Sequence, residues 1–176
     1  MLNPSPHLWA LVAGLIVGAT GCSPALNWRE VRHAGAPARV LMPCKPDVAE
    51  RPVALRDQST VLHMQACAAQ GFDFSFAAMA LPPGWQTGQA LQAWQQASLA
   101  TWGAHAEAVQ AQALPIMRAS SDALPAQWAV NGTSRHVRSL WFGADGWVYQ
   151  MAIYAPLQSR DVQSVAETYF SGVTLP

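Results

Sequence analysis

The chain has 176 residues, of which 11% are charged, with ten acidic and ten basic side chains. Roughly 25% of the residues in an ordinary soluble domain are charged. Sparse and balanced charge argues against nucleic acid or an anionic membrane surface as a partner. Eight tryptophans and a hydrophobic fraction of 51% predict a packed core rather than a disordered chain.

The N-terminal apolar run, Leu8–Cys22, ends in Ala19-Thr20-Gly21 and a cysteine. It has about 14 residues before that cysteine, whereas a membrane span needs roughly 20, so it predicts a secretory signal. The segment resembles a bacterial lipobox, which implies cleavage before Cys22 and acylation of that residue. Two other interpretations are open, namely a signal cleaved to release a soluble protein and a short anchor that stays attached.

The lipobox resemblance also implies a location. Several acyl chains on Cys22 anchor a protein firmly in a lipid bilayer, because one chain alone binds only marginally. Ser23 follows the cysteine, which favours the outer membrane of a Gram-negative cell over the inner one, where Asp is the retention signal. The predicted divisions are a signal peptide over residues 1–21, a tether over 22–37 and a single domain over 38–176.

Cys44 and Cys67 are the other two cysteines of the chain. An even pair in an exported protein predicts a disulfide bond, because the periplasm is oxidising. The bond would close a loop of about 24 residues and stabilise the fold by roughly 3 kcal/mol. The alternative is a pair of buried thiols that pack as small apolar groups.

The first half of the domain alternates polar and apolar residues with the period of a strand. Strands are expected over residues 38–42, 51–55, 60–68 and 73–81. Within the third of these, Leu62 and Met64 fall on one face, while His63 and Gln65 fall on the other. The pattern predicts an antiparallel meander that ends at Pro82-Pro83-Gly84.

Two predicted helices and a hairpin make up the second half. We expect a helix over 87–102 with Thr87 as its N-cap, a strand over 104–113, a loop over 115–125, a strand over 127–130, a hairpin of 136–142 with 147–154, and a helix over 159–171. The alanines of 104–113 suit a helix equally well. This order of elements predicts an α+β domain with a mainly antiparallel sheet flanked by two helices.

A family resemblance rests on the layout of these elements. Trp28, the strand over 40–43, the helix over 91–102, the hairpin over 137–154 and Tyr169-Phe170-Ser171 occur in the order seen in the PsbP-like α/β/α sandwich superfamily, which the chain resembles over most of 28–175. The resemblance implies a binding or assembly module rather than an enzyme. Residues 42–47 are similar to a segment of small exported lipoproteins of Gram-negative proteobacteria.

The residue patterns predict neither a metal site nor a catalytic centre. None of the five histidines has another histidine two to four positions further on, which is the spacing typical of zinc ligands. The chain has no G-x-S-x-G motif, and Ser120-Ser121-Asp122 has no histidine close in sequence. We therefore expect no metal, no cofactor and no enzymatic activity.

Aromatic side chains are the first candidates for binding. Trp94 and Trp102, with Tyr149 and Tyr154, are predicted to line a groove between the sheet and a helix, because Trp and Tyr are enriched at interaction hot spots. The alternative is that tryptophan fills a core that is poor in Leu and Ile.

A small basic cluster is the second candidate. Arg135 and Arg138 lie at the start of the hairpin, where they could hold a carboxylate or phosphate group, or could form a solvated strand end. Together these features predict a lipid-anchored binding or assembly module of the cell envelope with a protein partner. The alternative prediction is a periplasmic protein that binds a small apolar or aromatic molecule.

Overall fold

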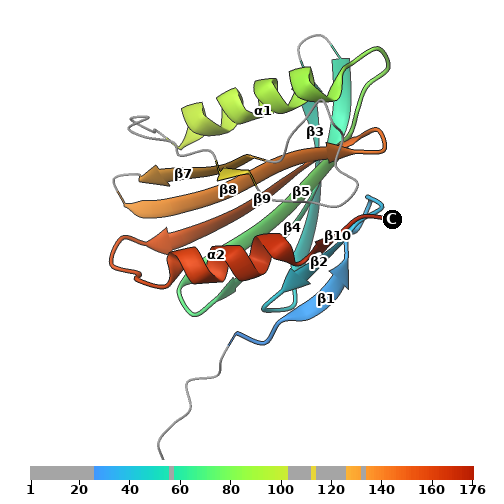
Figure 1. The fold of residues 1–176 in the computed structure, drawn as a ribbon. Coiled ribbons are helices and arrows are strands. Elements are labelled where there is room, and N and C mark those ends of the chain that lie inside the picture. The colour runs from blue at the N-terminus through green and yellow to red at the C-terminus, as the bar shows by residue number, and fades with distance from the viewer. Residues whose placement is uncertain (1–25, 56–57, 103–111, 114–125, 132–133) are drawn as a thin grey trace, which may run out of the picture.

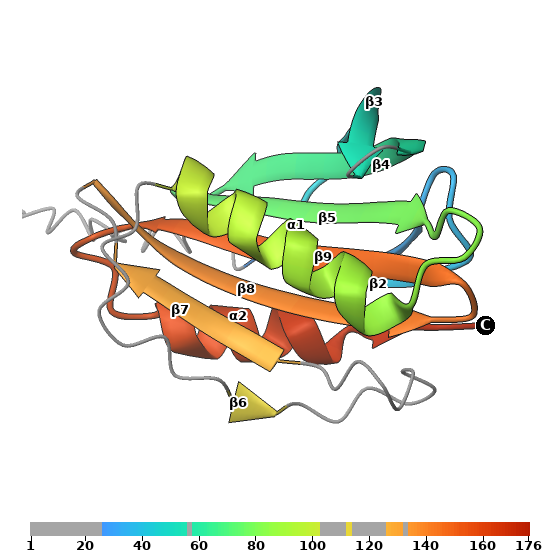
Figure 2. The same ribbon diagram turned by 90° about the horizontal axis from the view of Figure 1, so that it is seen from above.

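The computed structural model describes residues 26–55, 58–102, 112–113, 126–131 and 134–176. Helix α1 (Thr87–Thr101) and helix α2 (Val162–Ser171) lie on opposite sides of a large sheet, α1 above it and α2 below it in Figure 1. The view from above in Figure 2 shows α1 lying across the sheet strands, with α2 beneath them. The predicted α+β class, with an antiparallel sheet flanked by two helices, is confirmed.

The large sheet has seven strands in the order β3-β4-β5-β9-β8-β7-β6, and each neighbouring pair is antiparallel. The strands are β3 (Asp47–Leu55), β4 (Gln58–Ala69), β5 (Phe72–Ala80), β6 (Gln112–Ala113), β7 (Ala126–Asn131), β8 (Arg135–Ala144) and β9 (Trp147–Pro156). All strands predicted from 51 to 81 and from 127 to 154 are present. Of the strand predicted over 104–113, residues 104–111 lie outside the described residues, as does the loop predicted over 115–125.

A second, three-stranded sheet covers part of the face that carries α2. It consists of β1 (Arg29–Arg32), β2 (Arg39–Met42) and β10 (Val173–Thr174), with β2 in the middle. The tether predicted over residues 22–37 overlaps β1, because Arg29–Arg32 pairs antiparallel with β2 and so belongs to the fold. The strand predicted over 38–42 is present as β2, whereas β1 and β10 were not predicted.

The main core lies between the large sheet and the layer formed by α2 and the small sheet. Alternate residues of β5 and β9 point into it, among them Phe74, Phe76 and Met151, all without solvent exposure. From α2, Tyr169 packs edge-on against Phe74 at 5.3 Å between ring centroids and donates a hydrogen bond to the carbonyl oxygen of Ser75 at 2.8 Å. This face of the sheet is therefore filled by aromatic side chains.

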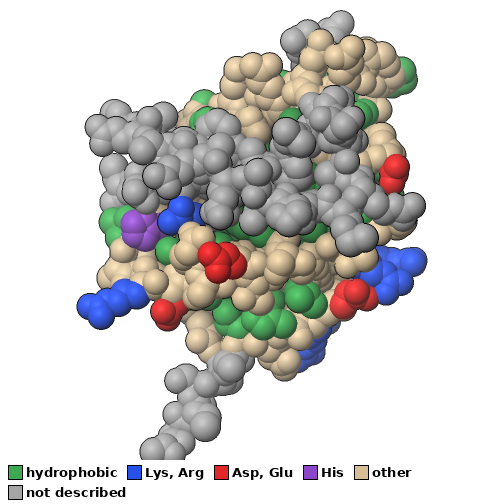
Figure 3. Space-filling model, viewed as in Figure 1, with side chains coloured by type: hydrophobic (Ala, Val, Ile, Leu, Met, Phe, Trp, Pro, Cys, Tyr) green, Lys and Arg blue, Asp and Glu red, His purple; other side chains and the backbone are tan. Residues whose placement is uncertain are grey.

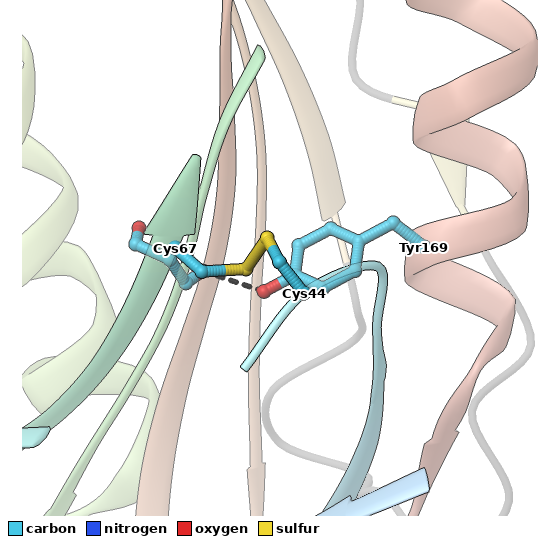
Figure 4. Close-up of a disulfide and its surroundings, with 4 residues drawn as sticks. Cys44, Cys67 and Tyr169 are labelled. Carbon is cyan, nitrogen blue, oxygen red and sulfur yellow. Dashed lines mark hydrogen bonds between the residues drawn. A yellow bond between two sulfur atoms is a disulfide. The ribbon is translucent and has the colours of Figure 1, made fainter. Parts of the chain in front are cut away.

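A disulfide bond joins Cys44, which follows β2, to Cys67 in β4. It lies beside Tyr169, as Figure 4 shows, and so connects the small sheet with the large one on the side of the main core. The bond links residues separated by 23 positions in the sequence.

One histidine is part of this packing. His33 is 2% exposed, its Nε2 atom lies 3.3 Å from the carbonyl oxygen of Phe76, and its ring packs edge-on against the Phe76 ring. Burial lowers the pKa of His33 from its usual value, and the nearby His63 adds to that effect. The ring is therefore held in its neutral form in the folded protein.

The two described helices have 15 and 10 residues. Neither helix within the described ranges combines the length and the hydropathy needed to cross a bilayer.

Replacing both Cys44 and Cys67 by Ala should lower the free energy of unfolding by roughly 3 kcal/mol, because the cross-link restricts the unfolded chain. Urea unfolding of the oxidised protein, the reduced protein and the double variant provides the measurement. The reduced protein and the variant should unfold at the same lower midpoint. An oxidised protein no more stable than the variant would contradict a structural role for the bond.

The stability should fall as the pH is lowered from about 7 to about 5. The unfolded chain binds a proton at His33 near the usual pKa of 6.5, whereas the folded protein binds it only at lower pH. Unfolding is therefore favoured through this window. His33→Gln keeps an amide donor for the Phe76 carbonyl and should flatten the pH dependence of the urea midpoint. An equally steep dependence in the variant would assign the effect to other groups.

Candidate functional site

A groove lies between α1 and the part of the large sheet that α1 leaves open. The helix packs over β8 and β9, so β3, β4 and β5 face outward beside it on the same side of the sheet. The groove has a volume of about 790 Å³ and is partly open to solvent. Its floor is formed by Met64 of β4, Ala77 and Met79 of β5, and Gln150 and Tyr154 of β9.

One wall of the groove is the end of the β3–β4 hairpin. The pairing of β4 with β3 runs from Gln58 to Ala66, whereas its pairing with β5 begins only at His63. Residues 58–62 of β4 are therefore not paired with β5, and Figure 1 shows this end of the hairpin bending toward the side that carries α1. Thr60 donates a hydrogen bond to the carbonyl oxygen of Ala80 at 3.1 Å, which ties the hairpin end to β5.

Helix α1 forms the other wall. Leu91 is buried against the sheet together with Trp141 and Val148. The helix begins at Thr87 with Gln86 in the N-cap position, so the prediction that Thr87 caps the helix is corrected by one residue. The methyl group of Thr87 instead lies against Gly143 of β8, where a Cβ atom would be only 2.0 Å from it. A residue without a side chain at this point lets the first helical turn approach the sheet closely.

Hydrogen bonds connect the floor of the groove with the helix wall. Gln150 donates from Nε2 to the hydroxyl oxygen of Ser98 at 3.2 Å. The rings of Trp102 and Tyr154 meet edge to face, with 6.1 Å between centroids. Burial raises the pKa of Tyr154, and a hydrogen bond from Trp102 acts in the opposite direction. The phenol group is therefore neutral at physiological pH, and the polar groups of the floor are already partnered.

Arg51 is the one charged side chain among the described residues that line the groove. It lies on β3 opposite Leu62, is exposed, and has no ion-pair partner within the described residues. The preceding residue, Glu50, points to the other side of the hairpin, where its carboxylate lies 2.9 Å from Nδ1 of His63. The described lining of the groove thus combines apolar and polar surface, with a single charged side chain at its rim.

The described residues offer little to acid–base or metal chemistry. Acid–base catalysis needs a titratable group that can reach the reacting proton, usually beside a second such group. Here Arg51 and Tyr154 are the titratable groups of the described lining, and burial raises the pKa of the Tyr154 phenol. No group of three metal-ligating side chains occurs within the described parts of the chain.

The aromatic residues singled out in the sequence divide between the two faces of the sheet. Trp94 and Trp102 both line the groove, as does Tyr154. Tyr149 lies on the opposite face, in the main core, where its ring stacks on those of Phe76 and Phe142. Alternation along β9 places an odd-numbered and an even-numbered residue on opposite faces, so the sequence itself contained the signal that separates the two tyrosines.

The basic cluster is divided in the same way. Arg135 forms an ion pair with Asp73 and donates a hydrogen bond to the carbonyl oxygen of Tyr154 at 2.8 Å, so it links β8 to β5 and β9. Arg138 points to the other face of β8, and burial lowers its pKa. On the face drawn in Figure 3, the basic side chains that are coloured do not gather in one patch. The two arginines do not meet in one patch.

Arg51 and Met64, which line the groove, were not among the predicted site residues. The strand alternation that puts Leu62 and Met64 on one face was visible in the sequence. The helix that lies beside the face with Leu62 and Met64 depends on how the β3–β4 hairpin pairs with β5. This pairing joins strands through long-range contacts, and no local sequence pattern encodes its register.

A large antiparallel sheet between two helices, with a small sheet beside the C-terminal helix, defines a PsbP-like fold. The solution structure of cyanobacterial PsbP (CyanoP) from Synechocystis sp. PCC 6803 matches with a TM-score of 0.53, over 91% of this chain and 99% of that chain, at 13% sequence identity. The predicted PsbP-like resemblance is confirmed at the level of the fold. Neither a family model nor a curated protein matches the sequence, and the lipoprotein resemblance stays a prediction.

The three tyrosines of the chain should resist ionisation in the folded protein, because burial raises the pKa of Tyr149, Tyr154 and Tyr169. The near-ultraviolet absorbance of phenolate should stay flat through about pH 10 and rise there only in denaturant. In Trp102→Ala, which uncovers Tyr154, one tyrosine of the three should ionise near its usual pKa. A native protein in which all three ionise near pH 10 would contradict the described packing.

Proposed function

We propose that this chain is a non-enzymatic binding protein of the bacterial cell envelope, anchored by a lipidated Cys22. The groove between α1 and the large sheet is the observation that carries the binding role. Its volume of about 790 Å³ lies within the range of small-molecule sites, roughly 300–1,000 Å³. Its described lining provides apolar surface and partnered polar groups rather than facing acids and bases.

The groove favours a small apolar or aromatic ligand over a protein partner. A protein-docking surface is expected to expose a contiguous apolar patch. Among the described residues, the large exposed apolar side chains are Val48, Val61 and Leu157. Val48 pairs with Gln65 and Val61 with Pro52, so the two valines lie four positions apart along the β3–β4 ladder. A concave apolar site is therefore better supported than a flat one.

The support for anchoring comes from the N-terminal sequence. Ala19-Thr20-Gly21 precedes Cys22 in the manner of a lipobox, and β1 begins at Arg29. Six residues between the cysteine and the first strand span at most roughly 20 Å when extended. A lipid on Cys22 would therefore hold the domain close to the membrane surface.

The anchor is tested by the intact mass of the full chain after expression in a Gram-negative host and purification from its membranes. We expect a species that begins at Cys22 and carries a diacylglyceryl adduct and an N-acyl chain. In Cys22→Ala that adduct should be absent, because the acceptor thiol is gone. A full-length or unlipidated mass for the natural sequence would overturn the lipid anchor.

The groove is tested with N-phenyl-1-naphthylamine, a neutral aromatic probe that fluoresces in apolar sites. The protein is the chain from residue 22 onward with Cys22→Ala, secreted with an ordinary cleaved signal. We expect binding that Ala97→Phe weakens by about tenfold or more, because the added ring fills the groove. Ala97 lines the groove and is exposed on α1.

Ala100→Phe is the matched control for this experiment. Ala100 is also exposed on α1 but does not line the groove, so the same added ring should leave the dissociation constant of the probe unchanged. Circular dichroism checks that both variants are folded. A natural sequence that does not bind the probe, or an Ala97→Phe variant that binds it as before, would overturn the proposed binding site.

A further inference from the structure

Large apolar side chains on the floor and the helix wall of the groove suit a flat or flexible hydrocarbon body. Met64 and Met79 lie on its floor, and Trp94 and Trp102 on its helix wall. Methionine side chains adapt their shape to different ligands, and aromatic rings present large rigid surfaces. A ligand of this site therefore has most of its surface in hydrocarbon or aromatic groups.

Two pairs of polar groups inside the groove are hydrogen-bonded to each other. Gln150 is bonded to Ser98, and Trp102 to Tyr154. Burial of a ligand charge beside these groups would be costly, because none of the described residues of the floor provides a counter-charge. A charged group on the ligand therefore has to lie at the rim rather than on the floor.

Arg51 at the rim provides that counter-charge. Of the described carboxylates near it in the sequence or the sheet, Glu50 contacts His63 and Asp73 is paired with Arg135. Asp47 faces the same side as Arg51 but lies four positions away along β3, opposite Ala66. A guanidinium group can bind a carboxylate or sulfonate through two parallel hydrogen bonds.

We propose that the groove binds an amphipathic organic anion, with the hydrocarbon body between α1 and the sheet and the acidic group on Arg51. This inference rests on the proposed binding function and adds the class of ligand and its orientation. It also assigns a role to Arg51, a residue that makes no ion pair within the described structure.

Two probes that differ only in charge test the orientation. 8-Anilinonaphthalene-1-sulfonate carries the ring system of N-phenyl-1-naphthylamine with one added sulfonate. Arg51→Gln should lower the affinity for the sulfonate probe by about two- to fivefold, which is the size of effect expected for an exposed ion pair. The same substitution should leave the affinity for the neutral probe unchanged. Arg51→Lys should restore most of the affinity, because it keeps the positive charge.

Arg29→Gln is the matched control, because Arg29 is also an exposed arginine on a strand but belongs to the small sheet. It should alter the affinity of neither probe. Raising the salt concentration from about 0.05 M to about 0.5 M should weaken binding of the sulfonate probe to the natural protein. It should have little effect on binding to the Arg51→Gln variant.

Competition experiments distinguish an acyl-chain acid from an aromatic acid as the ligand. Displacement of the sulfonate probe by dodecanoate indicates an acyl-chain carboxylate, and displacement by naphthalene-2-carboxylate indicates an aromatic one. Displacement by neither acid would overturn the inference. Equal effects of Arg51→Gln on both probes would overturn it as well, while leaving the groove as an apolar binding site. If neither probe binds the natural sequence, the proposed function itself fails.

Discussion

The arrangement of this protein depends on the central pair of strands, β5 and β9, which pack in the main core on one face and border the groove on the other. On the α2 side, β5 presents Phe74 and Phe76, which are completely buried among aromatic neighbours. On the α1 side, the same strand presents Ser75, Ala77 and Met79. Alternation along one strand thus separates large side chains from mostly small ones. The thick core forms on one face, and the room for a groove remains on the other.

The two faces also differ in how firmly they are held. The α2 side contains the Cys44–Cys67 disulfide, the Tyr169–Ser75 hydrogen bond and the closely packed aromatic rings. The α1 side is held by Leu91 over Trp141 and by single hydrogen bonds such as that of Gln150 with Ser98. Fewer buried contacts give a lower cost of local opening. The side that carries the groove is therefore the one that can adapt to a ligand.

The sequence predicted elements with a strong local pattern. The β8–β9 hairpin was evident from its alternation and its turn, and α2 from the stripe formed by Val162, Ala166 and Tyr169. The four-residue strand β2 was predicted, whereas β1 and β10, which gain their stability from pairing with β2, were not. Trp94 and Trp102 were identified as candidates for a groove, but its rim residue Arg51 was not, because the overhang of β4 beyond β5 is a long-range feature.

The proposed preference of the groove for an anion follows from the local position of Arg51 and not from the net charge of the chain. With ten acids and ten bases, the protein has no net field that would draw in an anion. A single cation still selects for anions where it forms no ion pair with a described carboxylate, and Arg51 on β3 is in such a position. The proposed lipid on Cys22 adds to this selection. Amphipathic acids concentrate at membranes, and a groove tethered there meets them at a higher effective concentration than a free protein does.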